Sequence, residues 1–134
     1  MTMLDYFKKV VTKDYFNFKG RAQRKEYWSF ILFNFIIGSV LGLLAINSQG
    51  ADTEKLNIFE KISNIYTLGV FIPSIAVWVR RIHDVGKSGW WLLLAFIPIL
   101  GAIYLIYLSV KDSEPGDNRF GPNPKENGSI IIQK

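Results

Sequence analysis

The sequence predicts an all-α integral membrane protein: a bundle of three transmembrane helices with an amphipathic interfacial helix at the N-terminus. Three observations lead to this fold class. Of the 134 residues, 49% are hydrophobic. They gather in three long runs, each close to the ~20 residues that a helix needs to cross the hydrocarbon core. Cations lie outside the uncharged centres of these runs, and seven of them precede the first run. We therefore expect one membrane domain, residues 1–110, followed by a polar and mostly irregular tail, residues 111–134.

The first expected element is an amphipathic helix over residues 3–18. Its apolar residues recur at three- and four-residue spacing, which places them on one side of a helix. They are Leu4, Phe7, Val11, Tyr15 and Phe18, with Lys9 and Lys13 on the opposite side. This pattern is typical of a helix lying in the membrane interface. A helix packed on the protein's own cytoplasmic face would show the same pattern, so both interpretations stay open.

The three spans are expected at about residues 28–46, 58–79 and 90–110. The apolar run at the centre of each is uncharged. Pro73 and Pro98 fall inside the second and third spans, where membrane helices tolerate proline as a kink.

The second span has two possible starting points. Asn57 and Glu60 have the three-residue spacing of a capping box, which favours a start near residue 58. An earlier start at Asp52 is the alternative. In either case the helix would project beyond the bilayer.

Small and polar residues mark one face of the first span. Asn34, Gly38 and Gly42 recur every four residues, and the two glycines form a GxxxG pair that allows close helix approach. The contact could lie inside the bundle or join two copies of the chain. Deep positions of the spans lack Asp, Glu, Lys and Arg, which argues against a transporter or pump.

The distribution of cations predicts the orientation. Seven precede the first span, two lie in the next connection and three in the one after it. Cytoplasmic loops are enriched in Lys and Arg, so the N-terminus and the connection before the third span are expected in the cytoplasm. Three spans would then place the tail in the periplasm. A cytoplasmic tail would let Asn118 and Arg119 join the basic residues, but it needs a further membrane pass or a re-entrant segment.

Two basic-aromatic motifs border the spans: "FKGRAQRKEYW" at residues 18–28 and "RRIHDVGKSGWW" at residues 80–91. Arginine holds phosphate oxygens bidentately, and tryptophan is enriched where the bilayer meets water. The motifs therefore predict interface anchors at Trp28, Trp90 and Trp91. They also predict a cytoplasmic rim that binds anionic headgroups or a partner protein, with the candidate residues Arg21, Arg24, Arg80, Arg81, His83, Asp84 and Lys87.

Electrostatics predicts specific pairs within this rim. A carboxylate placed among converging cations lowers their mutual repulsion. We therefore expect Asp84 to pair with Arg21 or Arg24, and Glu26 to pair with Arg80 or Arg81. The second motif is expected to be a wet turn between helices.

Composition excludes several kinds of chemistry. The chain has no cysteine and one histidine, which excludes disulfides, thiolate catalysis and Cys- or His-rich metal sites. No nucleophile elbow, P-loop or nucleic-acid recognition motif is present. We expect no catalytic residue, metal, cofactor or nucleic-acid partner. The expected partners are the bilayer, with its anionic headgroups, and a membrane protein or a second copy of the chain.

The two motifs and the tail sequence "GDNRFGPNP" at residues 116–124, arranged around three spans, resemble a family of small bacterial inner-membrane proteins, domain of unknown function 805. The resemblance covers Phe18 to Pro124. It implies a bacterial inner membrane location and no particular reaction.

The expected function is a non-enzymatic membrane scaffold or partner-binding subunit. The alternative is a binding protein, carrier or enzyme for an anionic, lipid-like substrate, using His83, Asp84 and the arginines. A pocket leading into the bundle near His83 would favour this alternative.

Overall fold

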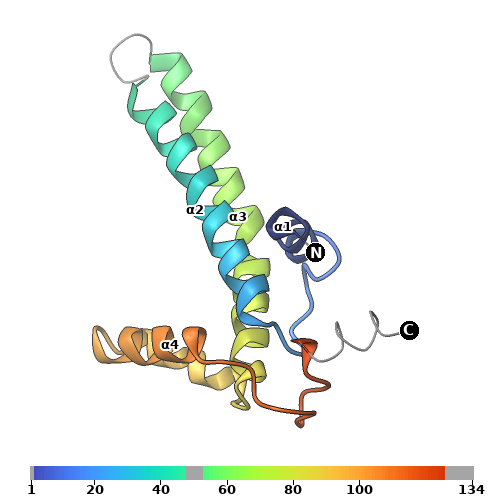
Figure 1. Ribbon diagram of the computed structural model, residues 1–134. Coiled ribbons are helices and arrows are strands. Elements are labelled where there is room, and N and C mark those ends of the chain that lie inside the picture. The colour runs from blue at the N-terminus through green and yellow to red at the C-terminus, as the bar shows by residue number, and fades with distance from the viewer. Residues whose placement is uncertain (1, 48–52, 126–134) are drawn as a thin grey trace.

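The computed structural model describes residues 2–47 and 53–125, and within them the chain is all-α apart from an isolated bridge between Asn118 and Gly121. A long hairpin of two helices is crossed at one end by two shorter helices (Figure 1). In chain order the helices are α1 (Met3–Val11), α2 (Arg24–Asn47), α3 (Thr53–Asp84), the 3-10 helix η2 (Gly89–Phe96) and α4 (Leu100–Val110).

Helix α1 begins at a capping box. The Thr2 hydroxyl accepts from the Asp5 backbone N–H at 3.2 Å, and the Asp5 carboxylate accepts from the Thr2 N–H at 2.9 Å. The helix packs on α2 through Phe7, whose ring stacks on Phe30 at 5.9 Å. The expected helix over residues 3–18 is therefore too long. The apolar side of α1 packs on the protein itself, which is one of the two interpretations that the sequence left open.

Helices α2 and α3 are long and apolar enough to cross a membrane, and within the described residues no other helix meets that condition. The second expected span is extended at both ends, because α3 runs from Thr53 to Asp84. Asn57 lies inside the helix, so the expected capping box at Asn57 and Glu60 is wrong. Asp52 lies outside the described residues. Pro73 is accommodated within the helix, as the sequence predicts.

The hairpin is held partly by polar contact. The Tyr66 hydroxyl on α3 donates to Asn34 Oδ1 on α2 at 2.7 Å, so Asn34 does lie at a helix contact. Gly38 and Gly42 do not, because a Cβ at either position would meet nothing within 4 Å. The prediction that this glycine pair makes a close contact inside the chain is therefore wrong. Contact with a second copy of the chain stays a prediction.

The third apolar run does not form one helix. Its 3-10 helix η2 ends at Phe96, and α4 begins at Leu100 after a break where Ile99 has φ +67°. Pro98 explains the break, because proline lacks the N–H for a helical hydrogen bond and disfavours helical geometry in the preceding residue. The expected single span over residues 90–110, and with it the three-helix bundle, is therefore wrong.

Buried apolar residues gather at one end of the hairpin in two clusters. One joins α1, α2 and α3 through Val10, Ala22, Tyr27, Phe30 and Val77. The other joins the end of α3 to α4 through Ile82, Val85, Leu105 and Leu108. Farther along the hairpin, large apolar side chains such as Phe35 (71% exposed) and Leu68 (76% exposed) face outward. Such a surface suits a lipid environment.

Candidate functional site

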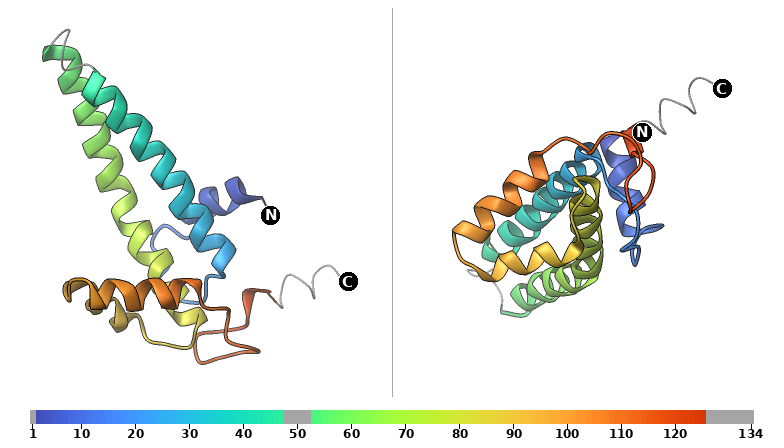
Figure 2. Two further views of the ribbon diagram at one scale, coloured as in Figure 1. Left: turned by 60° about the vertical axis from the view of Figure 1, so that its left-hand side comes forward. Right: turned by 90° about the horizontal axis from the view of Figure 1, so that it is seen from below.

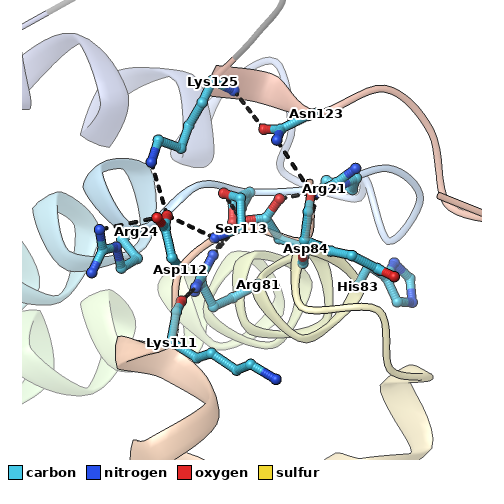
Figure 3. Close-up of polar contacts among 12 residues, drawn as sticks. Arg21, Arg24, Arg81, His83, Asp84, Lys111, Asp112, Ser113, Asn123 and Lys125 are labelled. Atoms are coloured by element: carbon cyan, nitrogen blue, oxygen red, sulfur yellow. Dashed lines mark hydrogen bonds and ion pairs between the residues drawn. The ribbon is translucent and has the colours of Figure 1, made fainter. Parts of the chain in front are cut away.

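The two basic-aromatic motifs meet at the end of the hairpin that also carries η2 and α4 (Figure 3). The first motif leads into α2, and the second contains the last residues of α3. They bring together a group of charged residues, which we call the ionic cluster: Lys9, Asp14, Arg21, Glu26, Arg80, Arg81 and Asp84. Glu26, Arg80, Arg81 and Asp84 are at most 2% exposed. The expectation of a wet turn is therefore wrong for residues 80–85, which are buried, whereas residues 86–91 are half-buried or exposed.

Asp84 lies at the centre of the cluster. Its Oδ1 accepts from Arg21 Nε at 2.9 Å, and its Oδ2 accepts from Arg81 Nη1 and from the Ser113 hydroxyl, the latter at 2.5 Å. The expected pairing of Asp84 with Arg21 is confirmed. Arg24 instead contacts Asp112 at 3.5 Å on the surface.

Arg21 also fixes the tail. Its guanidinium donates to the Asp84 carbonyl at 3.2 Å. It further donates to three tail carbonyls, those of Glu114 (2.6 Å), Gly116 (2.8 Å) and Gly121 (3.3 Å). The tail therefore lies at the same end of the hairpin as the N-terminal arm. The expectation that three spans separate the arm from the tail is therefore wrong for the described part of the tail, residues 111–125.

Arg81 joins three other segments in the same way. It donates to the carbonyls of Ala22 at 2.9 Å and Ser109 at 3.1 Å, and also to that of Lys111. One side chain from α3 thus contacts the chain before α2, the last turn of α4 and the start of the tail. Because the guanidinium has five N–H donors in a fixed plane, it can serve several acceptors at once.

Glu26 is the centre of the second half of the cluster. Its carboxylate accepts from Arg80 Nη1 at 2.7 Å and from Lys9 Nζ at 3.0 Å, so the expected pairing with Arg80 is confirmed. Asp14 lies 3.1 Å from Lys9 Nζ and 3.6 Å from Arg80 Nη1. Arg80 Nη2 is buried and has no hydrogen-bond partner among the described residues.

The cluster nearly balances its charges: four cations face three carboxylates, and every cation has a carboxylate within 4 Å. Removing one partner from such a buried group leaves an uncompensated charge, with a typical loss of about 3–5 kcal/mol of stability. The arrangement therefore defines one geometry for the segments that it joins.

Two carboxyl groups in or beside the ionic cluster, those of Asp14 and Asp112, have lowered pKa values. Burial raises the pKa of Asp14, but hydrogen bonds from Asn17 and Lys9 and the charge of Arg80 lower it further than burial raises it. Hydrogen bonds from Lys125 and from the Ser113 N–H lower the pKa of Asp112. Both groups are therefore ionised at neutral pH, and both act as acceptors for neighbouring cations.

His83 is the residue on which a catalytic interpretation would depend. Its Nδ1 lies 3.0 Å from the Gly20 carbonyl, and its ring stacks on Phe120 with 3.9 Å between centroids. The Asn118 amide donates to the His83 carbonyl at 3.0 Å. A nearby pocket of about 310 Å³ is lined by Val85 and residues 111–115, not by His83. The imidazole therefore holds the tail against α3.

The remaining candidates lie outside the cluster. Lys87 Nζ sits 4.8 Å from the centre of the Trp91 ring, a cation–π contact. The Trp28 indole N–H donates to the Ser109 carbonyl at 3.2 Å, which makes Trp28 a contact between α2 and α4. Trp90 is 78% exposed. Interface anchoring by these tryptophans stays a prediction.

Sequence reasoning missed the tail residues that complete the cluster. Ser113 binds Asp84, and Glu114 lies against Gly86, where a Cβ would approach its Oε2 to 2.2 Å. Gly86 also has φ +85°, which L side chains rarely adopt. A short polar stretch after an apolar run has no periodicity that would predict its contacts. Only a topology that places the tail on the same side of the membrane as the two motifs could have indicated them.

Comparison with known proteins identifies related chains. The family described as "Protein of unknown function (DUF805)" matches residues 15–122. Inner membrane protein YhaH of Escherichia coli K12 is 45% identical over 124 residues, which cover 91% of this chain and 98% of that protein. Inner membrane protein YhaI of the same strain is 37% identical over 115 residues, covering 86% and 92% respectively. No solved structure matches the chain.

Proposed function

The chain belongs to the DUF805 family, which includes inner membrane proteins of bacteria, and we propose that it is a non-enzymatic scaffold of the inner membrane. In this proposal α2 and α3 cross the bilayer, and the ionic cluster and both ends of the described chain are cytoplasmic. The scaffold presents the outward face of the hairpin to a partner within the membrane.

The observation that carries the proposal is that the motif arginines are occupied by the protein itself. Arg21 and Arg81 each donate to Asp84 and to at least three backbone carbonyls. An incoming phosphate would have to displace these acceptors from the arginines. It would also lie close to the buried Asp84 carboxylate, which carries a charge of the same sign. The cluster instead joins the arm, the hairpin, α4 and the tail in one fixed arrangement, as a scaffold requires.

The orientation is supported by cations that the cluster does not use. Exposed cations lie on the arm, at the start of α2, and on the tail: Lys8, Lys13, Lys19, Arg24, Lys25, Lys111, Arg119 and Lys125. The tail cations, which oppose a three-span topology, lie at the same end as the others. Their common side favours a cytoplasmic location by the positive-inside rule.

The alternative function, a binding protein, carrier or enzyme for an anionic lipid-like substrate, has less support. It requires Arg80, Arg81, His83 and Asp84 to face a pocket, whereas these residues are at most 8% exposed. The two proposals differ in what an anionic lipid does to the protein.

Titration of the full chain in neutral detergent with short-chain phosphatidylglycerol tests this difference. If the protein has a specific headgroup site, the unfolding temperature rises with lipid concentration and reaches a plateau. His83→Gln would abolish this increase. The scaffold proposal predicts a small, unsaturable increase that is equal in wild type and His83→Gln. Short-chain phosphatidylcholine is the control lipid. A saturable increase with phosphatidylglycerol alone, lost in His83→Gln, would refute the scaffold proposal.

The partner part of the proposal has its own test. A photoreactive amino acid at Phe35 or Leu68, both exposed on the hairpin, should form a discrete crosslinked product with a membrane protein in intact cells. The same product should form in the His83→Gln background. Crosslinks to lipid alone at both positions would contradict a partner on this face.

A further inference from the structure

The third apolar run leaves large side chains uncovered on both of its helices. Trp90, Phe96, Ile99 and Leu100 are 78%, 83%, 74% and 74% exposed. Apolar residues therefore face outward at the start of η2, at its end and at the break before α4. Contiguous apolar surfaces of this kind indicate a membrane or protein contact.

Both ends of this segment are attached to the same end of the hairpin. At its beginning, the Lys87 N–H donates to the Ile82 carbonyl at 3.1 Å. At its end, the Ser113 hydroxyl and the Glu114 N–H donate to Asp84, at 2.5 Å and 2.8 Å. The chain between them leaves the cytoplasmic end of α3 and returns to it. It therefore makes no net crossing of the membrane.

Neither helix of the segment is long enough to cross alone. Eight residues of η2, at ~2.0 Å per residue in a 3-10 helix, extend ~16 Å. Eleven residues of α4, at ~1.5 Å per residue, also extend ~16 Å. The hydrocarbon core is ~30 Å thick. The pair lies across the hairpin rather than along it (Figures 1 and 2).

The break between the helices is compatible with an apolar environment. Backbone N–H groups there donate within the segment, from Ile97 to Leu94, from Leu100 to Pro98 and from Gly101 to Ile97. A Cβ at Gly101 would lie 1.7 Å from the Leu94 carbonyl oxygen, so glycine allows the close approach of the two helices. Because an unpaired backbone N–H is costly in an apolar environment, the pairing of these three groups lowers the cost of placing the break near lipid.

We infer that the segment from Gly89 to Val110 is a helical hairpin embedded in the single leaflet next to the ionic cluster, with anionic phospholipid of that leaflet as its partner. The inference rests on the proposed crossing of the membrane by α2 and α3.

Two features favour this partner. Two open apolar grooves, about 500 and 370 Å³, lie along the segment and share Trp91, Leu94 and Ile97 as lining residues. Their shape and lining suit lipid acyl chains. A lysine stands at each end of the segment, Lys87 before it and Lys111 after it. Lysines at the membrane boundary attract anionic headgroups.

Depth-dependent quenching tests the inference on the full chain, which contains no cysteine. Phe96→Cys, carrying an environment-sensitive fluorophore, is reconstituted in phosphatidylethanolamine–phosphatidylglycerol vesicles with spin labels at shallow or central acyl positions. We expect stronger quenching by the shallow label. Strongest quenching by the central label, as for a span, would overturn the inference, and so would absence of quenching by both, as for a protein-covered surface.

Leu68→Cys is the matched control, because Leu68 is similarly exposed (76%, against 83% for Phe96) and lies within α3. The central label should quench it most. Failure of this control refutes the proposed crossing by α3, whereas failure at Phe96 with the control intact refutes only the single-leaflet placement.

The lipid preference is tested with the double variant Lys87→Gln, Lys111→Gln. Shallow-label quenching at Phe96 should be stronger in vesicles with phosphatidylglycerol than in phosphatidylcholine alone, and the double variant should lose this difference. Equal quenching of the wild-type chain in both lipids would refute the anionic lipid as partner.

Discussion

The two ends of the α2–α3 hairpin are held together by different kinds of contact. Near the end that carries the ionic cluster, buried ion pairs and backbone carbonyls join the arm, both helices, α4 and the tail. Along the outer part, the Tyr66–Asn34 hydrogen bond joins α2 to α3, and the glycine face of α2 is open. Lipid tails are as apolar as leucine, so apolar contact alone gives little preference for one arrangement in a membrane. Directional polar contacts supply that preference here.

The largest difference between the two regions should appear at Asp84. Asp84→Asn leaves Arg21 and Arg81 buried without their carboxylate, and a loss of about 3–5 kcal/mol is expected. Asp112→Asn is the matched control, because Asp112 binds Arg24 and Lys125 at the surface. It should leave the unfolding midpoint in detergent unchanged. Equal midpoints for the two variants would show that the buried cluster does not stabilise the fold.

The next largest difference in stability is expected between two glycine substitutions. Gly101→Ala places a Cβ against the Leu94 carbonyl and should destabilise the protein by about 1–3 kcal/mol, a typical result of overpacking. Gly42→Ala meets open space and should cause no loss of stability. Thermal unfolding measures the midpoints, and chemical crosslinking measures oligomeric state. Loss of an oligomer in Gly42→Ala alone would identify this face as a contact between copies.

The smallest effect is expected in the outer hairpin. Tyr66→Phe removes the hydroxyl that binds Asn34, and such bonds between membrane helices average about 0.6 kcal/mol. In an Asn34→Leu background the same substitution should have no further effect. A loss in Tyr66→Phe as large as that in Asp84→Asn would remove the distinction between the two regions.

Hydropathy predicted the first two spans and failed on the third for a physical reason. The apolar runs inside α2 and α3 are uncharged and long enough to cross, and each forms part of one helix. The third run is equally apolar, but Pro98 and the positive φ of Ile99 divide it, and hydropathy does not detect a break in backbone geometry. As a consequence, the predicted position of the tail, separated from the arm by three spans, was also wrong.

The candidate site was predictable in its pairs but not in its burial. Charge complementarity between the motifs indicated Arg21 or Arg24 for Asp84, and Arg80 or Arg81 for Glu26. The first of each two forms the pair, whereas the pairs of Asp84 with Arg81 and of Glu26 with Lys9 were not predicted. Their enclosure depends on α1 and on the tail, through contacts such as Ser113 with Asp84 and Phe120 with His83. These contacts join residues far apart in the sequence and have no periodic pattern.

The central claim is that the motif arginines have their functional partners within the chain. A double-mutant cycle on Arg80 and Glu26 tests it most directly, with Arg80→Met, Glu26→Gln and the double variant unfolded in detergent. If the pair is structural, each single variant is destabilised and the double variant loses less than the sum. A coupling of about 0.5–3 kcal/mol is expected for residues in one salt-bridge network. Additive losses, with Glu26→Gln as stable as wild type, would contradict the claim and assign Arg80 to a partner outside the chain.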